Sequence, residues 1–123
     1  MARHWHGYGW IGRERAESRA FEDELPPMEV KNWLLKPRRL IRGTFHTIED
    51  AVTWMAGELR QYPHPESYGS SDEARLQFVR ETLALDAGSD VVWGWYPNNS
   101  QYVSRALITC PRVGEDIPCP QGL

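Results

Sequence analysis

Residues 91–110 carry two extended runs on either side of a Pro-Asn-Asn-Ser tetrad, VVWGWYPNNSQYVSRALITC. Trp93 and Trp95 alternate with other residues in the first run, which is the two-residue period of a β-strand. Asn98 and Asn99 tolerate the positive φ angles that a two-residue hairpin turn requires. The stretch therefore predicts an antiparallel hairpin held by cross-strand aromatic pairs. With these asparagines at the centre of the turn, the expected pairs are Trp95 with Tyr102, Trp93 with Ser104, and Gly94 with Val103.

Two helices are expected before this hairpin. Residues 47–62, TIEDAVTWMAGELRQY, repeat apolar residues at helical spacing, with Thr47 as the N-cap and Pro63 as the stop. A second helix is expected to begin at Ser71 or Asp72 and to use Gly88 as its C-terminal cap.

Two further strands are predicted upstream, over residues 28–35 and 38–46, and a short strand is possible within WHGYGWI. We therefore expect an α+β two-layer domain, with an antiparallel sheet of four to five strands and two helices in the order β-β-α-α-β-β. The 123 residues suit one domain. Residues 1–27 are interpreted as an aromatic and charged segment packing on or leading into a core at 28–111, and residues 112–123 as a tail.

Composition excludes several classes of protein. The formal charge of −3 argues against general affinity for nucleic acid, which favours basic domains. No apolar run is long enough to span a bilayer, and the first residues lack the apolar core of a signal peptide. We expect a cytoplasmic protein that binds no membrane. In that compartment Cys110 and Cys119 are expected to be free thiols, with a disulfide as the alternative.

The sharpest chemical feature is the tripeptide His4-Trp5-His6. Positions i and i+2 of a strand point the same way, so His4 and His6 are candidate metal ligands. Zinc needs three or four ligands, and no sequence pattern brings His46, Cys110 or Cys119 to this pair. We therefore expect no cofactor, and zinc affinity no better than micromolar.

Catalysis has weaker support. The common catalytic and cofactor-binding motifs do not occur in the chain. Cys110 and His46 form the best nucleophile–base pair available, since each is expected to end a strand. A small buried thiol and a surface histidine are the commoner explanation.

A binding role is the preferred hypothesis. Residues 31–46 contain five Lys and Arg residues and no acid, although the acidic segment FEDELPPME at 21–29 could neutralise them within the molecule. Interfaces are enriched in Trp, Tyr and Arg. We expect a non-enzymatic protein that docks an acidic protein partner; the alternative is a cofactor-free enzyme or binder for a hydrophobic small molecule in a Trp-lined pocket. A homodimer is left open. The candidate binding residues are Trp10, Trp33, Arg38, Arg39, Arg42, Trp93, Trp95 and Tyr102.

Overall fold

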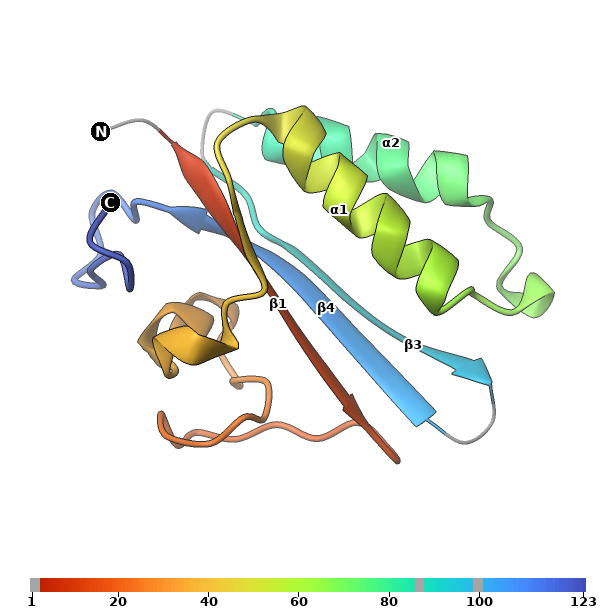
Figure 1. Cartoon of the computed structure of the whole chain (residues 1–123), viewed down its shortest axis with the longest axis horizontal. Helices are drawn as coiled ribbons and strands as arrows, with labels where there is room; N and C mark the ends of the chain where they lie inside the picture. The colour runs from red at the N-terminus through yellow and green to blue at the C-terminus, as the bar shows by residue number, and fades with distance from the viewer. Residues whose placement is uncertain (1–2, 86–87, 99–100) are drawn as a thin grey trace.

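The computed structural model describes residues 3–85, 88–98 and 101–123. One antiparallel sheet, in the order β2-β1-β4-β3, places the first and last strands side by side in its centre (Figure 1). Two helices lie against one face of this sheet (Figure 1). The chain is thus a small α+β domain, and no helix in its described part is long and apolar enough to cross a bilayer. The strands are β1 (His4–Gly12), β2 (Gly43–Phe45), β3 (Val91–Asn98) and β4 (Gln101–Cys110), and the helices are α1 (Ile48–Gln61) and α2 (Asp72–Leu83).

Both predicted helices are confirmed, including their starts. The side chain of Thr47 accepts a hydrogen bond from the Asp50 amide at 3.1 Å, and Ser71 does the same for the Ala74 amide at 3.1 Å. We call the sheet face under these helices the helix face. Its main cluster of buried side chains is Trp5, Ala51, Val52, Met55, Val79, Leu83, Val91 and Leu107.

The opposite face, called the loop face, is covered by residues 30–42 and by the C-terminal segment 111–123. Two short 3₁₀-helices, η1 (Val30–Leu35) and η2 (Arg38–Leu40), lie in the first segment; a third, η3 (Glu66–Tyr68), precedes α2. The buried cluster on this face is smaller, and the partly buried Ile117 of the C-terminal segment packs against it. Its buried members are Tyr8, Trp33, Leu34, Ala106 and Ile108.

The prediction of a strand over residues 28–35 is wrong, because most of this segment is η1. Trp33 and Leu34 are adjacent in sequence and both are buried, which a helical turn permits and a strand with one covered face does not. Of the strand predicted over 38–46, only Gly43–Phe45 forms.

The aromatic N-terminal segment is instead a nine-residue strand in the middle of the sheet, β1. Gly7 and Gly9 make room for large side chains on the helix face. A Cβ at Gly7 would lie 3.0 Å from the Trp54 ring, and one at Gly9 would lie 2.6 Å from the Arg105 guanidinium. The sheet therefore has four strands, and residues 1–27 contribute one of them rather than only packing on a core.

The β3–β4 hairpin is confirmed, but its expected register is wrong by one residue. Trp93 pairs with Arg105, Gly94 with Ser104, and Trp95 with Val103, with an irregularity between Trp95 and Asn98. Asn98 pairs with Gln101, and Asn99, the other asparagine expected at the turn, lies outside the described residues. The cap predicted at Gly88 is also displaced: α2 is capped at Ala84, and Gly88 takes a positive φ in the connection that follows.

Candidate metal centre

The register of the two central strands brings histidine and cysteine together. On β1, His4 and His6 point to the loop face, on the same side as the buried Tyr8. On β4, Cys110 shares that face with Ile108 and is the direct cross-strand partner of His4, while Ile108 is the partner of His6. A pair of histidines near the start of the chain therefore meets a thiol near its end.

The fourth member of the cluster comes from the C-terminal segment. The Sγ atom of Cys119 lies 3.6 Å from His4 Nε2 and 3.5 Å from His6 Nε2. The potential ligand atoms of His4, His6, Cys110 and Cys119 all lie within 4.8 Å of one another, and three of the four residues are buried. Both cysteines are free thiols, as expected from the sequence.

These distances fit tetrahedral coordination of one metal ion. Zinc bonds of about 2.3 Å to sulfur and about 2.0–2.1 Å to nitrogen, at tetrahedral angles, separate sulfur from nitrogen by about 3.5 Å and sulfur from sulfur by about 3.8 Å. The two distances from Cys119 to the histidines already have the first value. Since no pair in the cluster exceeds 4.8 Å, closing it around one ion needs ligand movements of at most about 1 Å.

A hydrogen-bonded chain fixes the orientation of His6. The hydroxyl of Thr44, on the neighbouring strand β2, donates to Gln121 Oε1 at 2.8 Å, so it is free to accept from His6 Nδ1 at 3.0 Å. The proton of a neutral His6 then sits on Nδ1, and the lone pair of Nε2 faces Cys119. Metal-binding histidines characteristically donate their second ring nitrogen to an oxygen in this way.

The protonation states are also suited to a metal. Burial, followed by the nearby His4 and His46, lowers the pKa of His6 to about 4, so its ring is neutral near pH 7. Burial, followed by contact with Cys119, raises the pKa of Cys110 to about 12. This thiol keeps its proton unless a cation compensates the thiolate. One divalent cation and two thiolates give a centre with no net charge, which lowers the cost of burying it.

The Tyr8 hydroxyl is a further polar group on this face of the sheet. It is buried and lacks a hydrogen-bond partner among the described residues. Burial, followed by the charges of Cys110 and Cys119, raises its pKa. The hydroxyl therefore has an unused donor on the same face of the sheet as His6 and Cys110.

His4 and His6, the two metal candidates from the sequence, thus lie in one cluster with the two cysteines that the sequence did not connect to them. The missing information was the pairing of β1 with β4, since this register alone places Cys110 opposite His4. The ring of His46 lies 5.6 Å from that of His4, but His46 is exposed and outside the four-residue cluster. A catalytic role for His46 and Cys110 stays a prediction, and the raised pKa of Cys110 makes it a poor nucleophile.

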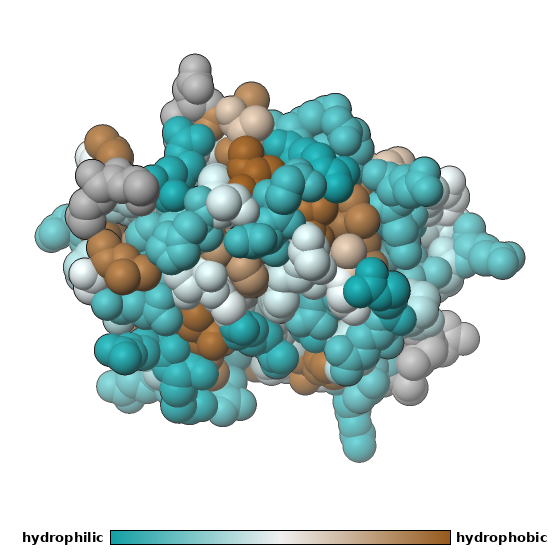
Figure 2. All heavy atoms as spheres, turned by 45° about the horizontal axis from the view of Figure 1, so that its top comes forward, coloured by the Kyte–Doolittle hydropathy of each residue, from teal (hydrophilic) through white to brown (hydrophobic). Residues whose placement is uncertain are grey.

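The aromatic candidates do not gather around one cavity. Trp95 is buried on the helix face, where its indole N–H donates to the Tyr62 carbonyl at 2.9 Å. Trp93 is half-buried on the same face. On the loop face, Trp33 is buried and stacks on Tyr8 at 4.8 Å, while Trp10 and Tyr102 are half-buried. Figure 2 accordingly shows hydrophobic side chains in several small patches between hydrophilic ones.

The basic run is largely paired within the molecule. Lys36 is buried and forms an ion pair with Asp23, Arg39 pairs with Glu24 at 3.0 Å, and Lys31 pairs with Glu115 at 2.9 Å. Arg38 and Arg42 are exposed. The acidic segment at 21–29 thus neutralises part of this run, as the sequence allowed.

Comparison of the chain with family models, with curated proteins and with solved structures gives no match.

Proposed function

We propose that the protein binds one zinc ion through His4, His6, Cys110 and Cys119, and that the ion fastens the C-terminal segment to the sheet. The observation that carries this proposal is the convergence of four ligand atoms within 4.8 Å of one another. Two sulfur and two nitrogen ligands in tetrahedral reach are the donor set that zinc favours. Four protein ligands leave no coordination position for water or substrate, so the role is structural rather than catalytic.

The C-terminal segment is the element that depends on the ion. Residues 111–123 contain no helix or strand. Besides Cys119, their contacts include the partly buried Ile117, the Gln121–Thr44 hydrogen bond and the Glu115–Lys31 ion pair. At the start of the segment, Arg112 also pairs with Asp90 at 2.8 Å. A metal bond to Cys119 ties this segment to the first strand, close to the opposite end of the chain.

The test is stoichiometry and affinity. Zinc is titrated calorimetrically into the metal-free chain, against a competing chelator, and cobalt(II) is used to detect tetrahedral thiolate coordination by absorption. We expect one ion per chain, bound with nanomolar or lower dissociation constant, as in structural zinc sites. Cys119→Ser should weaken binding at least 100-fold. His46→Ala is the matched control, because it removes an imidazole beside His4 without removing a ligand.

Binding no tighter than micromolar, or equal losses in Cys119→Ser and His46→Ala, would contradict the proposal and restore the expectation from the sequence.

Docking of an acidic macromolecule through the basic run stays a prediction. Because Lys31, Lys36 and Arg39 form ion pairs within the molecule, the basic run has fewer charges available to a partner than the sequence suggests. The small-molecule alternative likewise stays a prediction; in the described part of the chain the candidate tryptophans do not gather around one cavity.

A further inference from the structure

The outer edge of β3 carries backbone groups without strand partners. β3 is the last strand in the order β2-β1-β4-β3, so β4 is its only strand partner among the described residues. In an antiparallel pair, alternate residues direct both their N–H and C=O groups toward the partner strand, and the residues between them direct theirs away. Two hydrogen bonds identify the residues of β3 whose backbone N–H and C=O groups point away from β4.

The first is on β4, where the Thr109 amide donates to Asp90 Oδ1 at 2.7 Å, on the β3 side. Residues 103, 105 and 107 share this direction, so their partners Trp95, Trp93 and Val91 face β4. The second is on β3 itself, where the Tyr96 amide donates to Tyr68 Oη at 3.2 Å instead of to β4. Both bonds indicate that Val92 and Gly94 direct their backbone groups outward.

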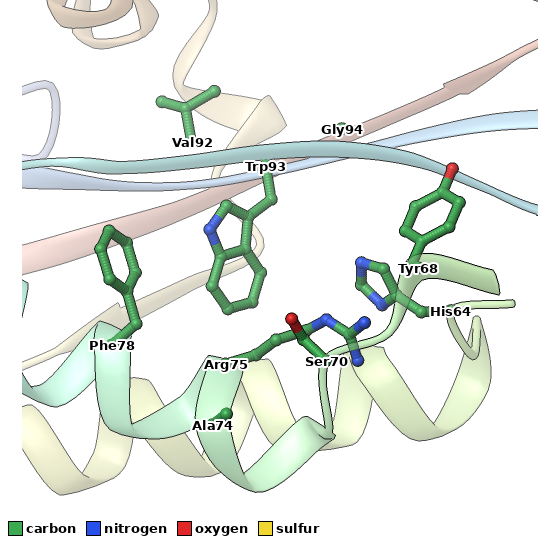
Figure 3. Close-up of a pocket in the computed structure, with 9 residues that line it drawn as sticks. All are labelled: His64, Tyr68, Ser70, Ala74, Arg75, Phe78, Val92, Trp93 and Gly94. Atoms are coloured by element: carbon green, nitrogen blue, oxygen red, sulfur yellow. The ribbon is translucent and has the colours of Figure 1, made fainter. Parts of the chain in front are cut away.

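The side chains along this edge are apolar and neutral. Residues 91–98, VVWGWYPN, contain no charged residue. Between β3 and α2 lies an open hollow of about 540 Å³, lined among others by Arg75, Phe78 and Trp93 (Figure 3). Val92, 45% exposed, projects from the opposite side of the strand, and Phe78 is 54% exposed (Figure 3). Apolar surface therefore borders the free edge on both faces of the sheet. A long, uncharged edge of this kind invites pairing with another strand.

We propose that the partner of this edge is β3 of a second copy of the chain, in an antiparallel pair about a two-fold axis at Trp93. In this register Val92 of each copy exchanges its backbone hydrogen bonds with Gly94 of the other, and the two Trp93 residues lie side by side in a non-hydrogen-bonded pair. The two four-stranded sheets become one continuous sheet. This proposal is independent of the zinc site.

Three observations favour a second copy over an unrelated peptide. The edge is self-complementary, because the same two outward residues supply and receive the bonds in both copies. It is also electrically neutral: the Arg75 guanidinium is already paired with Asp72 at 2.8 Å, so two copies do not repel and an acidic peptide gains little. Finally, the opposite sheet edge, β2, has only three residues and offers little backbone for a further strand to pair with. Association therefore closes at a dimer instead of growing into a filament.

The test uses the full chain, with zinc present, in sedimentation velocity over a hundredfold range of concentration. We expect a reversible dimer with twice the mass of one chain. Val92→Pro removes the outward N–H and suits an edge strand, so this variant should be monomeric, with an unchanged far-ultraviolet circular dichroism spectrum. Val92→Thr, which keeps the N–H and the branched Cβ, is the matched control and should remain dimeric. Gly94 is unsuitable for substitution, since a Cβ there would lie 1.5 Å from Tyr102 Oη.

Amide hydrogen exchange of the wild-type chain gives a second readout in case Val92→Pro does not fold. The Val92 and Gly94 amides should become at least tenfold more protected as the concentration rises through the dimerisation range. A wild-type chain that stays monomeric at all concentrations overturns the proposal. A dimer that persists in a folded Val92→Pro variant, or Val92 and Gly94 amides indifferent to concentration, overturns it as well.

Discussion

The two faces of the sheet are closed by different means. The helix face is covered by two amphipathic helices that bury a broad set of apolar side chains, including Met55, Val79 and Leu83. The loop face is covered by segments whose longest regular element is the six-residue η1. Its apolar cluster is smaller and is continued by the four-residue cluster of His4, His6, Cys110 and Cys119. Apolar burial is thus the main contribution on the first face, which also holds the buried Arg105–Glu58 ion pair, whereas the second depends more on specific bonds between polar groups.

The largest expected effect lies on the helix face. Trp95 is only 1% exposed, and its indole both stacks on His64 at 4.6 Å and donates to the Tyr62 carbonyl. Trp95→Ala should lower the free energy of unfolding by about 3–5 kcal/mol, as the loss of a large buried aromatic residue does. Urea unfolding measures this cost, and it should be the same with and without zinc. Trp93→Ala, at a half-buried position, is the control and should cost less. A negligible shift in both variants would mean that the hairpin contributes little to the core.

Zinc removal is expected to act on the loop face. A ligand that binds only the folded state stabilises it by about 2.7 kcal/mol at a free concentration of 100 times its dissociation constant, and by about 4.1 kcal/mol at 1,000 times. Chelation should therefore lower the urea midpoint and speed amide exchange in residues 111–123. The amides of α1 and α2 should keep their local protection. Equal loss of protection on both faces would show that they do not differ in their dependence on the ion.

The sequence predicted the elements that depend on local signals better than those that depend on long-range pairing. Helical spacing and the caps Thr47 and Ser71 are local signals, and they located both helices correctly. The hairpin was also found, but its register depended on the irregularity near the turn, which no side-chain pattern indicated. The alternation in RHWHGYGWIG is interrupted by glycines, so a long central strand was not evident there.

The candidate metal centre was the feature that the sequence predicted least. His4 and Cys119 are separated by 115 positions, and only the β1–β4 register and the fold of the C-terminal segment bring them together. Spacing rules for metal sites apply to ligands on one local element, and here two ligands lie on β1, one ends β4 and one follows it. Long-range pairing of strands is the step that a single sequence determines least.

Acid should test the helix face further, through His64. Burial, followed by the nearby Arg75, lowers the pKa of His64 from 6.5 to about 4. Between these two values the unfolded chain takes up the proton and the folded chain does not, so stability falls as the pH is lowered through this window and changes no further below it. Because the ring is partly exposed, we expect a loss of about 1 kcal/mol in the free energy of unfolding, which is less than the full pKa shift would give.

The measurement is urea unfolding of wild type and His64→Phe between pH 7 and pH 4. The phenylalanine keeps a ring against Trp95 but cannot take up a proton, so this variant should lose less stability on acidification. His6 titrates in a similar range, but it is present in both proteins and cancels in the comparison. Parallel pH curves would show that His64 is not held neutral by its surroundings.

The smallest effect is expected for the exposed ion pair between Arg39, in the loop-face segment 30–42, and Glu24, in the acidic segment 21–29. Both side chains are more than half exposed, and pairs of this kind contribute about 0.2–1 kcal/mol, which salt screens further. Arg39→Ala should therefore change the urea midpoint only slightly, and less in high salt. A larger loss would mean that the loop face depends on its ion pairs as well as on the metal.

The double variant Arg38→Glu/Arg39→Glu separates binding from stability, provided that its fold is intact. Docking through the basic run predicts that this variant does not capture an acidic partner at any salt concentration, and that the wild type loses its capture at high salt. Capture that is unchanged and insensitive to salt would leave these arginines with only their minor part in holding the loop face.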